Sequence, residues 1–180
     1  MSDNLYLKKL PNGLDVLVVE DNSVPLATIM MTFKAGEITE SANANGLTAL
    51  YTNMFLKNND HFNDFNYNAG GLGIQFLNAT TTEESANIFF TLPKSNLVAG
   101  LDFMNSAVRT ARMDPDELEK EKKSLDDQLL EKESNPFYSF SHEMLHHIWG
   151  ELYSRKSIAD HNAVRSATTA LIDTLKNKYF

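Results

Sequence analysis

Residues 74–92 read IQFLNATTTEESANIFFTL and contain two runs that are typical of β-strands. The polar tip Thr82-Glu83-Glu84 separates Ile74–Thr82 from Ser85–Leu92, so this stretch predicts a long antiparallel hairpin. From Leu97 onward the apolar residues recur at helical spacing instead. Strands followed by helices indicate an α+β fold, in which an antiparallel sheet is covered on one face by helices.

Two further extended regions and one helix are expected before this hairpin. Leu5–Glu20 alternates apolar and polar residues around the turn Pro11-Asn12-Gly13, which predicts strands buried on both sides. Ala27–Ala35 is rich in β-forming residues and predicts another strand. Glu37–Asn45 is polar and predicts a loop, whereas Gly46–Lys57 has an apolar stripe at helical spacing and predicts a helix.

The second half of the chain predicts helices separated by proline or glycine. Their expected ranges are Leu97–Ala111, Asp116–Lys132, Phe137–Trp149 and Ala163–Tyr179. The segment Asn58–Asn68 is rich in Asn and Asp and is expected to be a loop or a frayed helix.

The composition narrows the possible functions. At 180 residues the chain has the size of one ordinary domain, so we expect residues 1–180 to form a single domain. A total of 16 Lys and Arg against 24 Asp and Glu gives a formal net charge of -8, which disfavours nucleic acid and anionic membrane surfaces as partners. Without cysteine, a metal would need His and carboxylate ligands. No uncharged stretch approaches the roughly 18 residues of a membrane span, and cytoplasmic and exported locations both stay open.

The segment His142-Glu143-Met144-Leu145-His146 spells His-Glu-x-x-His inside the predicted helix Phe137–Trp149. Two imidazoles one turn apart with a neighbouring glutamate are what a zinc peptidase uses to hold the metal and activate its water. A third protein ligand is also needed, and the downstream candidates Glu151, Asp160 and His161 lack the spacing of the extended motifs. Two interpretations stay open, a zinc site or a polar helix edge beside apolar residues.

Four separated stretches of the sequence are informative through their order and spacing. They are Leu10–Leu14 (LPNGL), Phe33–Gly36 (FKAG) with Glu40, Gly46–Phe55 (GLTALYTNMF) and Glu121–Pro136 (EKKSLDDQLLEKESNP). In this order and spacing they resemble the amino-terminal domain of the pitrilysin/insulinase family of zinc peptidases, which includes the mitochondrial processing peptidase subunits. The third stretch resembles the family's Gly-Leu-Ala-His-x-x-Glu-His-Met-x-Phe helix. The fourth resembles the helix that carries the distal glutamate ligand and ends at Asn-Pro. The resemblance covers nearly the whole chain.

The metal-binding positions are where the chain departs from this family. In the inverted His-x-x-Glu-His motif, two histidines bind zinc and the glutamate activates water. The matching positions, which carry none of these side chains, are Ala49, Thr52 and Asn53. The distal ligand matches Gln128, because Glu121 and Pro136 match the family's acid seven residues earlier and its proline eight residues later. The resemblance therefore implies a chain with no catalytic residue, no metal site and no cofactor.

The resemblance also implies a place for peptides. In this family an extended substrate segment adds to the edge of the sheet, and Leu77–Thr81 (LNATT) is similar to the family's Asn-Ala-x-Thr strand. Peptide binding is thus expected at Asn78, Ala79 and Thr80. The alternative is that Asn78 and Thr80 only protect an edge strand from aggregation. In the family the last helix leads to further strands and a second similar domain, so we expect an incomplete domain with an exposed edge or apolar patch prone to self-association.

The sequence thus predicts a catalytically inactive homologue of a zinc peptidase. By resemblance, it would hold extended peptides and pair with an active sister peptidase subunit or with copies of itself. One alternative is a zinc metalloendopeptidase that uses His142, Glu143 and His146, and another is a purely structural subunit. Metal content separates the first alternative from the main prediction, and peptide binding separates the second.

Overall fold

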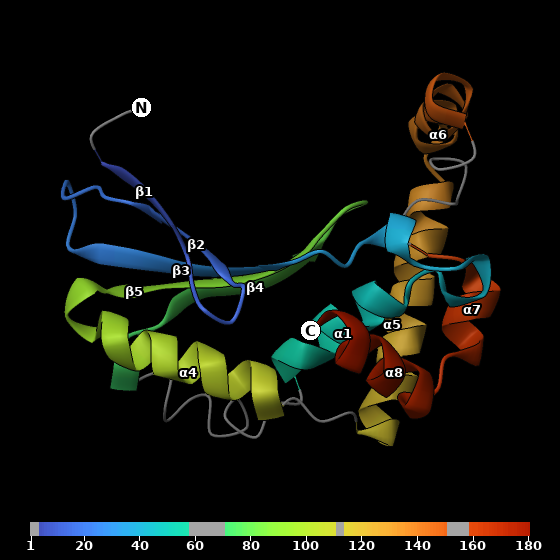
Figure 1. The fold of residues 1–180 in the computed structure, drawn as a ribbon. Helices are drawn as coiled ribbons and strands as arrows, with labels where there is room; N and C mark the ends of the chain where they lie inside the picture. Colours follow the sequence, from blue (N-terminus) through green and yellow to red (C-terminus); the bar gives the residue numbers. More distant parts are fainter. Residues whose placement is uncertain (1–3, 58–70, 111–113, 151–158) are drawn as a thin grey trace.

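The computed structural model describes residues 4–57, 71–110, 114–150 and 159–180, in which most helices follow the last strand (Figure 1). The elements, in chain order, are β1 (Leu5–Lys9), β2 (Asp15–Val19), β3 (Leu26–Phe33), the short 3-10 helices η1 (Glu37–Thr39) and η2 (Ala42–Ala44), α1 (Leu47–Lys57), β4 (Gln75–Thr81), β5 (Ala86–Pro93), η3 (Lys94–Asn96), α4 (Leu97–Thr110), α5 (Pro115–Glu133), α6 (Pro136–Trp149), α7 (His161–Ser166) and α8 (Thr169–Tyr179). The predicted α+β class is confirmed. The expected loop Asn58–Asn68 lies outside the described residues.

The main sheet has the strand order β3-β5-β4, and both pairings are antiparallel. The predicted hairpin is confirmed, because β4 and β5 pair across the polar turn that follows Thr81. Along β5 every second side chain is buried. These buried residues, which face the helices, are Ala86, Ile88, Phe90 and Leu92. Because side chains alternate between the faces of a strand, the period of two places one face of β5 in the core.

Helix α1 forms the centre of the core. Its apolar stripe of Leu50, Tyr51, Met54 and Phe55 is fully buried, as the helical spacing predicts. The helix lies against β4 and β5 and also packs on α5 and α8. The ring of Phe180 lies 4.3 Å from that of Tyr51, centroid to centroid. Figure 1 shows α4 along one face of the sheet and the β1–β2 hairpin on the other side.

Capping side chains determine where the later helices begin. Asp114, Asn135 and Asp160 each accept hydrogen bonds from the first backbone N–H groups of α5, α6 and α7. The single helix predicted over Ala163–Tyr179 is wrong, because α7 and α8 are separate. Thr168 has an extended backbone, and its side chain accepts a hydrogen bond from the Leu171 N–H at 3.3 Å, which begins a new helix. No helix in the described ranges is long and apolar enough to cross a membrane.

The hairpin of β1 and β2 differs from the expectation that Leu5–Glu20 is buried on both sides. The two strands pair with each other in a two-stranded sheet of their own. Leu7 is 70% exposed, and Leu17 and Val19 are exposed as well. The alternation of apolar residues indicates strands correctly, but it does not reveal whether other elements cover either face.

Candidate functional site

The loop before α1 holds a buried carboxylate. Glu40 is buried, and its two oxygens accept hydrogen bonds from the backbone N–H groups of Gly46 (2.7 Å) and Thr48 (2.6 Å). These donors lie at the first turn of α1, where backbone N–H groups have no partner within the helix. A negative charge there is also stabilised by the helix dipole. Glu40 therefore fixes the start of the helix that carries three of the predicted site positions.

Three of the degenerate metal-site positions lie on one face of α1. Ala49 is buried and Asn53 is half-buried. Thr52 is 1% exposed. Its hydroxyl lies 3.0 Å from the carbonyl oxygens of Thr48 and Ala49 and 2.9 Å from the hydroxyl of Thr81 on β4. The position that resembles the family's water-activating glutamate thus joins α1 to the edge strand.

The fourth degenerate position, Gln128, lies on α5, which packs against α1. Its side chain is exposed, and its amide nitrogen lies 3.4 Å from the Ser124 hydroxyl. Glu121, two turns earlier on the same face of α5, is buried. A zinc site needs imidazole, thiolate or carboxylate donors. An alanine, two amides and a threonine hydroxyl already bonded to carbonyls do not fit this metal, although the helices that bear them are in contact.

The predicted peptide-binding residues lie on β4, which forms one edge of the described sheet. Asn78 and Thr80 are exposed, whereas Ala79 packs against the core. The Ala79 N–H donates to the side-chain oxygen of Asn78 at 2.8 Å. This N–H is therefore on the outer side of β4, away from β5, because antiparallel strands direct alternate backbone groups to opposite sides. Asn78 covers a backbone donor that another strand could use.

The packing of α1 against the sheet and against α5 is accompanied by a match of this chain to a known protein family. The family model described as Insulinase (Peptidase family M16) matches residues 15–159. The chain belongs to peptidase family M16. No match was found among curated proteins.

Solved structures, one of them described as an M16 domain, share the fold. The structure described as the M16 inactive domain from Pseudomonas fluorescens aligns with a TM-score of 0.84 and 19% identity, over 96% of this chain and 43% of that one. The periplasmic protease PqqL from Escherichia coli aligns with a TM-score of 0.82 and 16% identity, over 98% of this chain and 21% of PqqL. A protease from Helicobacter pylori aligns with a TM-score of 0.79 and 17% identity, over 96% and 42%. The chain therefore spans less than half the length of these proteins.

The His-Glu-x-x-His segment of this M16 chain lies on α6, whose main neighbour is α5. The interpretation of this segment as a polar helix edge beside apolar residues stays a prediction. His142 and His146 are half-buried, whereas Phe137 is 78% exposed, and Phe140 and Ile148 are exposed too. The helix thus turns His142 and His146 toward the protein and its apolar stripe outward, and Figure 1 shows it projecting beyond the sheet.

Neither of the two candidates that the structure describes supplies the third zinc ligand that this segment would need. Asp160 caps α7 and His161 bonds to two carboxylates on α5, while Glu151 lies outside the described residues. Among the described residues of this M16 chain, no group of three or more His, Asp or Glu side chains could hold a metal.

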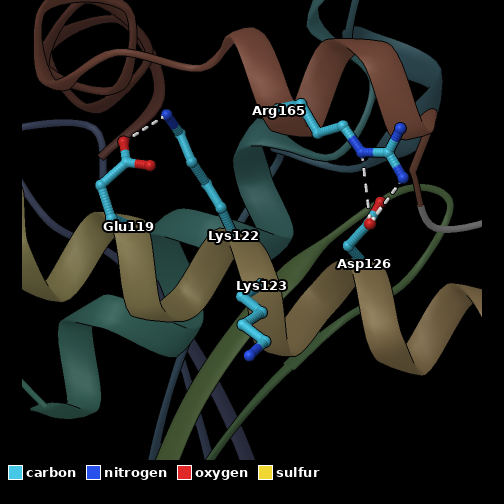
Figure 2. A pocket seen from close by; sticks show the side chains of 5 residues that line it. All are labelled: Glu119, Lys122, Lys123, Asp126 and Arg165. Carbon is cyan, nitrogen blue, oxygen red and sulfur yellow. Dashed lines mark hydrogen bonds and ion pairs between the residues drawn. The ribbon is translucent and has the colours of Figure 1, made fainter.

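A polar pocket between α5 and α7 is lined by charged side chains. Glu119, Lys122, Lys123, Asp126 and Arg165 line it (Figure 2). The Lys122 amine donates to Glu119 at 2.6 Å, and the Arg165 guanidinium donates twice to one Asp126 oxygen, at 2.8 and 3.2 Å. Figure 2 shows Lys123 pointing away from both pairs. Each of the two carboxylates is paired with a cation and Lys123 points away, so these five side chains present no common centre for a ligand.

His161 completes this connection between the two helices. Its Nδ1 lies 2.5 Å from the second Asp126 oxygen, and its Nε2 lies 3.2 Å from a Glu133 oxygen. The hydrogen bond to Asp126, followed by that to Glu133, raises the pKa of His161 above its ordinary value. The bonds from Arg165 and His161 lower the pKa of Asp126. Only the imidazolium can donate to both carboxylates at once.

We expect His161 to make stability depend on pH. Because its pKa is raised in the folded chain, its contribution is complete below its ordinary pKa of about 6.5 and is lost as the pH rises through the raised value. Asp126 has the opposite pH dependence, because its pKa is lowered in the folded chain. Its contribution to the free energy of unfolding is lost only as the pH falls into the acidic range. Urea unfolding of wild type and His161→Gln should therefore differ most near pH 6 and converge above the raised pKa.

The matched control is His147→Gln, which replaces an exposed histidine on α6. Its difference from wild type should not vary with pH in this way. A constant difference between wild type and His161→Gln across the range would show that the imidazole does not bridge the two carboxylates.

Sequence reasoning missed the Asp126–His161–Arg165 group and the contact between Thr52 and Thr81. Asp126 and Arg165 are 39 residues apart, and no local pattern relates them. The role of Asp160 could have been recognised, because Asp before a helix is a common cap. Glu40 appeared only as part of a resemblance, although an acid shortly before Gly46 and a helical stripe is a signal that could have suggested its capping role.

Proposed function

We propose that this chain is a non-catalytic M16 domain that binds an extended peptide along the outer edge of β4. The observation that carries the proposal is the state of Thr52, which is buried and bonded to Thr81 at 2.9 Å. At the position where the family motif has a water-activating glutamate, this chain has Thr52, and the Thr52 hydroxyl supports the edge strand β4. This arrangement favours a role in which β4 is held in place as a binding edge, while the peptidase reaction of the family motif is not carried out.

Peptide binding here would use the backbone of β4. β4 has β5 on one side, and among the described residues the Ala79 N–H on the other side bonds to the neighbouring Asn78 side chain. A peptide that displaces this side chain would extend an antiparallel sheet, whose ladder supplies affinity from backbone hydrogen bonds. We assign Asn78, Ala79 and Thr80 to this contact.

The partner of such a domain would be an active sister M16 subunit, or a second copy of the chain. Support comes from apolar side chains that are exposed on the β1–β2 hairpin, such as Leu7, and on α6, such as Phe137. Exposed apolar surface of this kind commonly marks a protein interface. Co-purification from the source cell tests the pairing, and material that contains neither an M16 peptidase nor a dimer would contradict it.

We expect Ala79→Pro to abolish peptide binding while the chain stays folded. Proline removes the outward N–H, and edge strands accept proline where the N–H does not face the neighbouring strand. The control Ala79→Ser keeps the N–H and should bind like wild type. Fluorescence anisotropy with a labelled ten-residue Ser/Thr/Val peptide measures Kd, and circular dichroism checks the fold.

Two results would overturn the proposal. If Ala79→Pro binds the peptide as tightly as wild type, β4 is not the binding edge, and if wild type does not bind, a purely structural role replaces peptide binding. If elemental analysis after dialysis against trace zinc finds one zinc per chain that is lost in His146→Ala, the metallopeptidase alternative on α6 is correct instead.

A further inference from the structure

Phe76 has a backbone conformation that is unusual for its residue type. Its φ is +54°, and among the described residues it is the one non-glycine residue with a positive φ. It lies in a β-bulge, because the two residues between Gln75 and Asn78 oppose only one residue between Thr91 and Phe89. Glycine is the usual residue at a left-handed bulge position, since a side chain makes that conformation costly. A bulky aromatic residue here therefore needs a compensating contact.

The free chain does not supply that contact. The Phe76 side chain is 77% exposed, so its ring gains little from burial. Bulges often redirect a side chain next to a binding site. Strained backbone conformations cluster at binding and active sites, so an exposed ring at such a position marks Phe76 as a candidate binding residue.

The surroundings of Phe76 suit an uncharged extended segment. Gly71–Thr82 contains no charged residue, although edge strands are commonly protected from pairing by charges. The protection that β4 does show is the contact of Asn78 with the Ala79 N–H, which a peptide can displace. A strand added antiparallel to β4 places its C-terminal half beside Phe76, because Phe76 is near the start of β4.

We propose that Phe76 is an aromatic anchor that selects peptides with an aromatic or large apolar side chain in their C-terminal half. This inference rests on the peptide-binding role proposed above. The ring of Phe76 would pair with that side chain, while the β4 backbone holds the peptide irrespective of its sequence. The occupant is an extended, uncharged peptide segment.

The experiment scans one Phe along the labelled ten-residue Ser/Thr/Val peptide and measures each Kd by fluorescence anisotropy with the full chain. Phe in the C-terminal half should tighten binding about fivefold, whereas Phe in the N-terminal half should not. In Phe76→Asn, which tolerates a left-handed backbone, this gain should vanish while the Phe-free peptide keeps its Kd. Phe76→Tyr should restore the gain. The matched control Phe140→Asn, at an exposed Phe on α6, should leave it unchanged.

The outcomes separate this inference from the proposed function. If Phe76→Asn keeps the positional gain, the anchor is wrong and peptide binding at β4 stands. If Phe76→Asn weakens all peptides equally, Phe76 shapes the edge and selects nothing, which also overturns the anchor. If no peptide binds wild type, both proposals fail.

Discussion

Glu40→Ala is expected to lower the free energy of unfolding by about 3 kcal/mol. The substitution leaves the backbone N–H groups of Gly46 and Thr48 without their acceptor in a buried place, and each such loss costs about 1–3 kcal/mol. It also removes a negative charge from the start of α1, where the helix dipole favours one. Urea unfolding followed by circular dichroism, with linear extrapolation to water, measures the change.

Two further variants make this result specific. Glu40→Gln should recover only part of the loss, because one of its two terminal atoms is a donor and cannot accept from a second N–H. Glu83→Ala, at an exposed glutamate in the β4–β5 turn, should change stability by no more than about 0.5 kcal/mol. If Glu40→Ala unfolded at the wild-type urea concentration, the carboxylate would not be what holds α1 in place.

Gly46→Ala is expected to destabilise the chain by about 3 kcal/mol or more. Gly46 has a φ of +106°, which a residue with a side chain rarely adopts. A Cβ at this position would lie 2.4 Å from the Cβ of Ala159 and 3.0 Å from Cγ2 of Val164. The backbone at the start of α7 would have to move away from α1, and buried contacts of both helices would be lost.

Gly13→Ala separates the cost of the backbone conformation from the cost of the close contact with Ala159 and Val164. Gly13 also has a positive φ, of +87°, but a Cβ there would meet no atom within 4 Å. Its substitution should therefore cost only the conformational part, about 1–2 kcal/mol. Equal losses in the two variants, again measured by urea unfolding, would mean that the close approach of α7 to Gly46 contributes nothing.

The types of the elements could largely be predicted from local patterns. The hairpin of β4 and β5 and the helix α1 were predicted because their apolar residues repeat with the periods of a strand and of a helix. The break between α7 and α8 was not predicted, because Thr168 continues an acceptable helical pattern and only its cap bond begins a new helix. Strand and helix periods are local properties, whereas such a break depends on how the two helices pack.

The candidate site was predicted in part. The resemblance correctly indicated the family, and the elements that bear Ala49, Gln128 and Asn78 do pack together around α1. The hydroxyl bond from Thr52 to Thr81 could not be predicted, because it joins residues of two elements whose spacing depends on the whole core. For the same reason, the outer position of the Ala79 N–H and the bulge at Phe76 became visible only in the structure.

By itself, the sequence determined the order of strands and helices and the stripe of α1 that enters the core. The tertiary structure decided which faces are covered. The β1–β2 hairpin and α6 both carry apolar stripes, yet both leave them exposed, whereas the stripe of α1 is buried. The physical reason is that periodicity belongs to one segment, while burial requires a second surface that only the folded chain brings into contact.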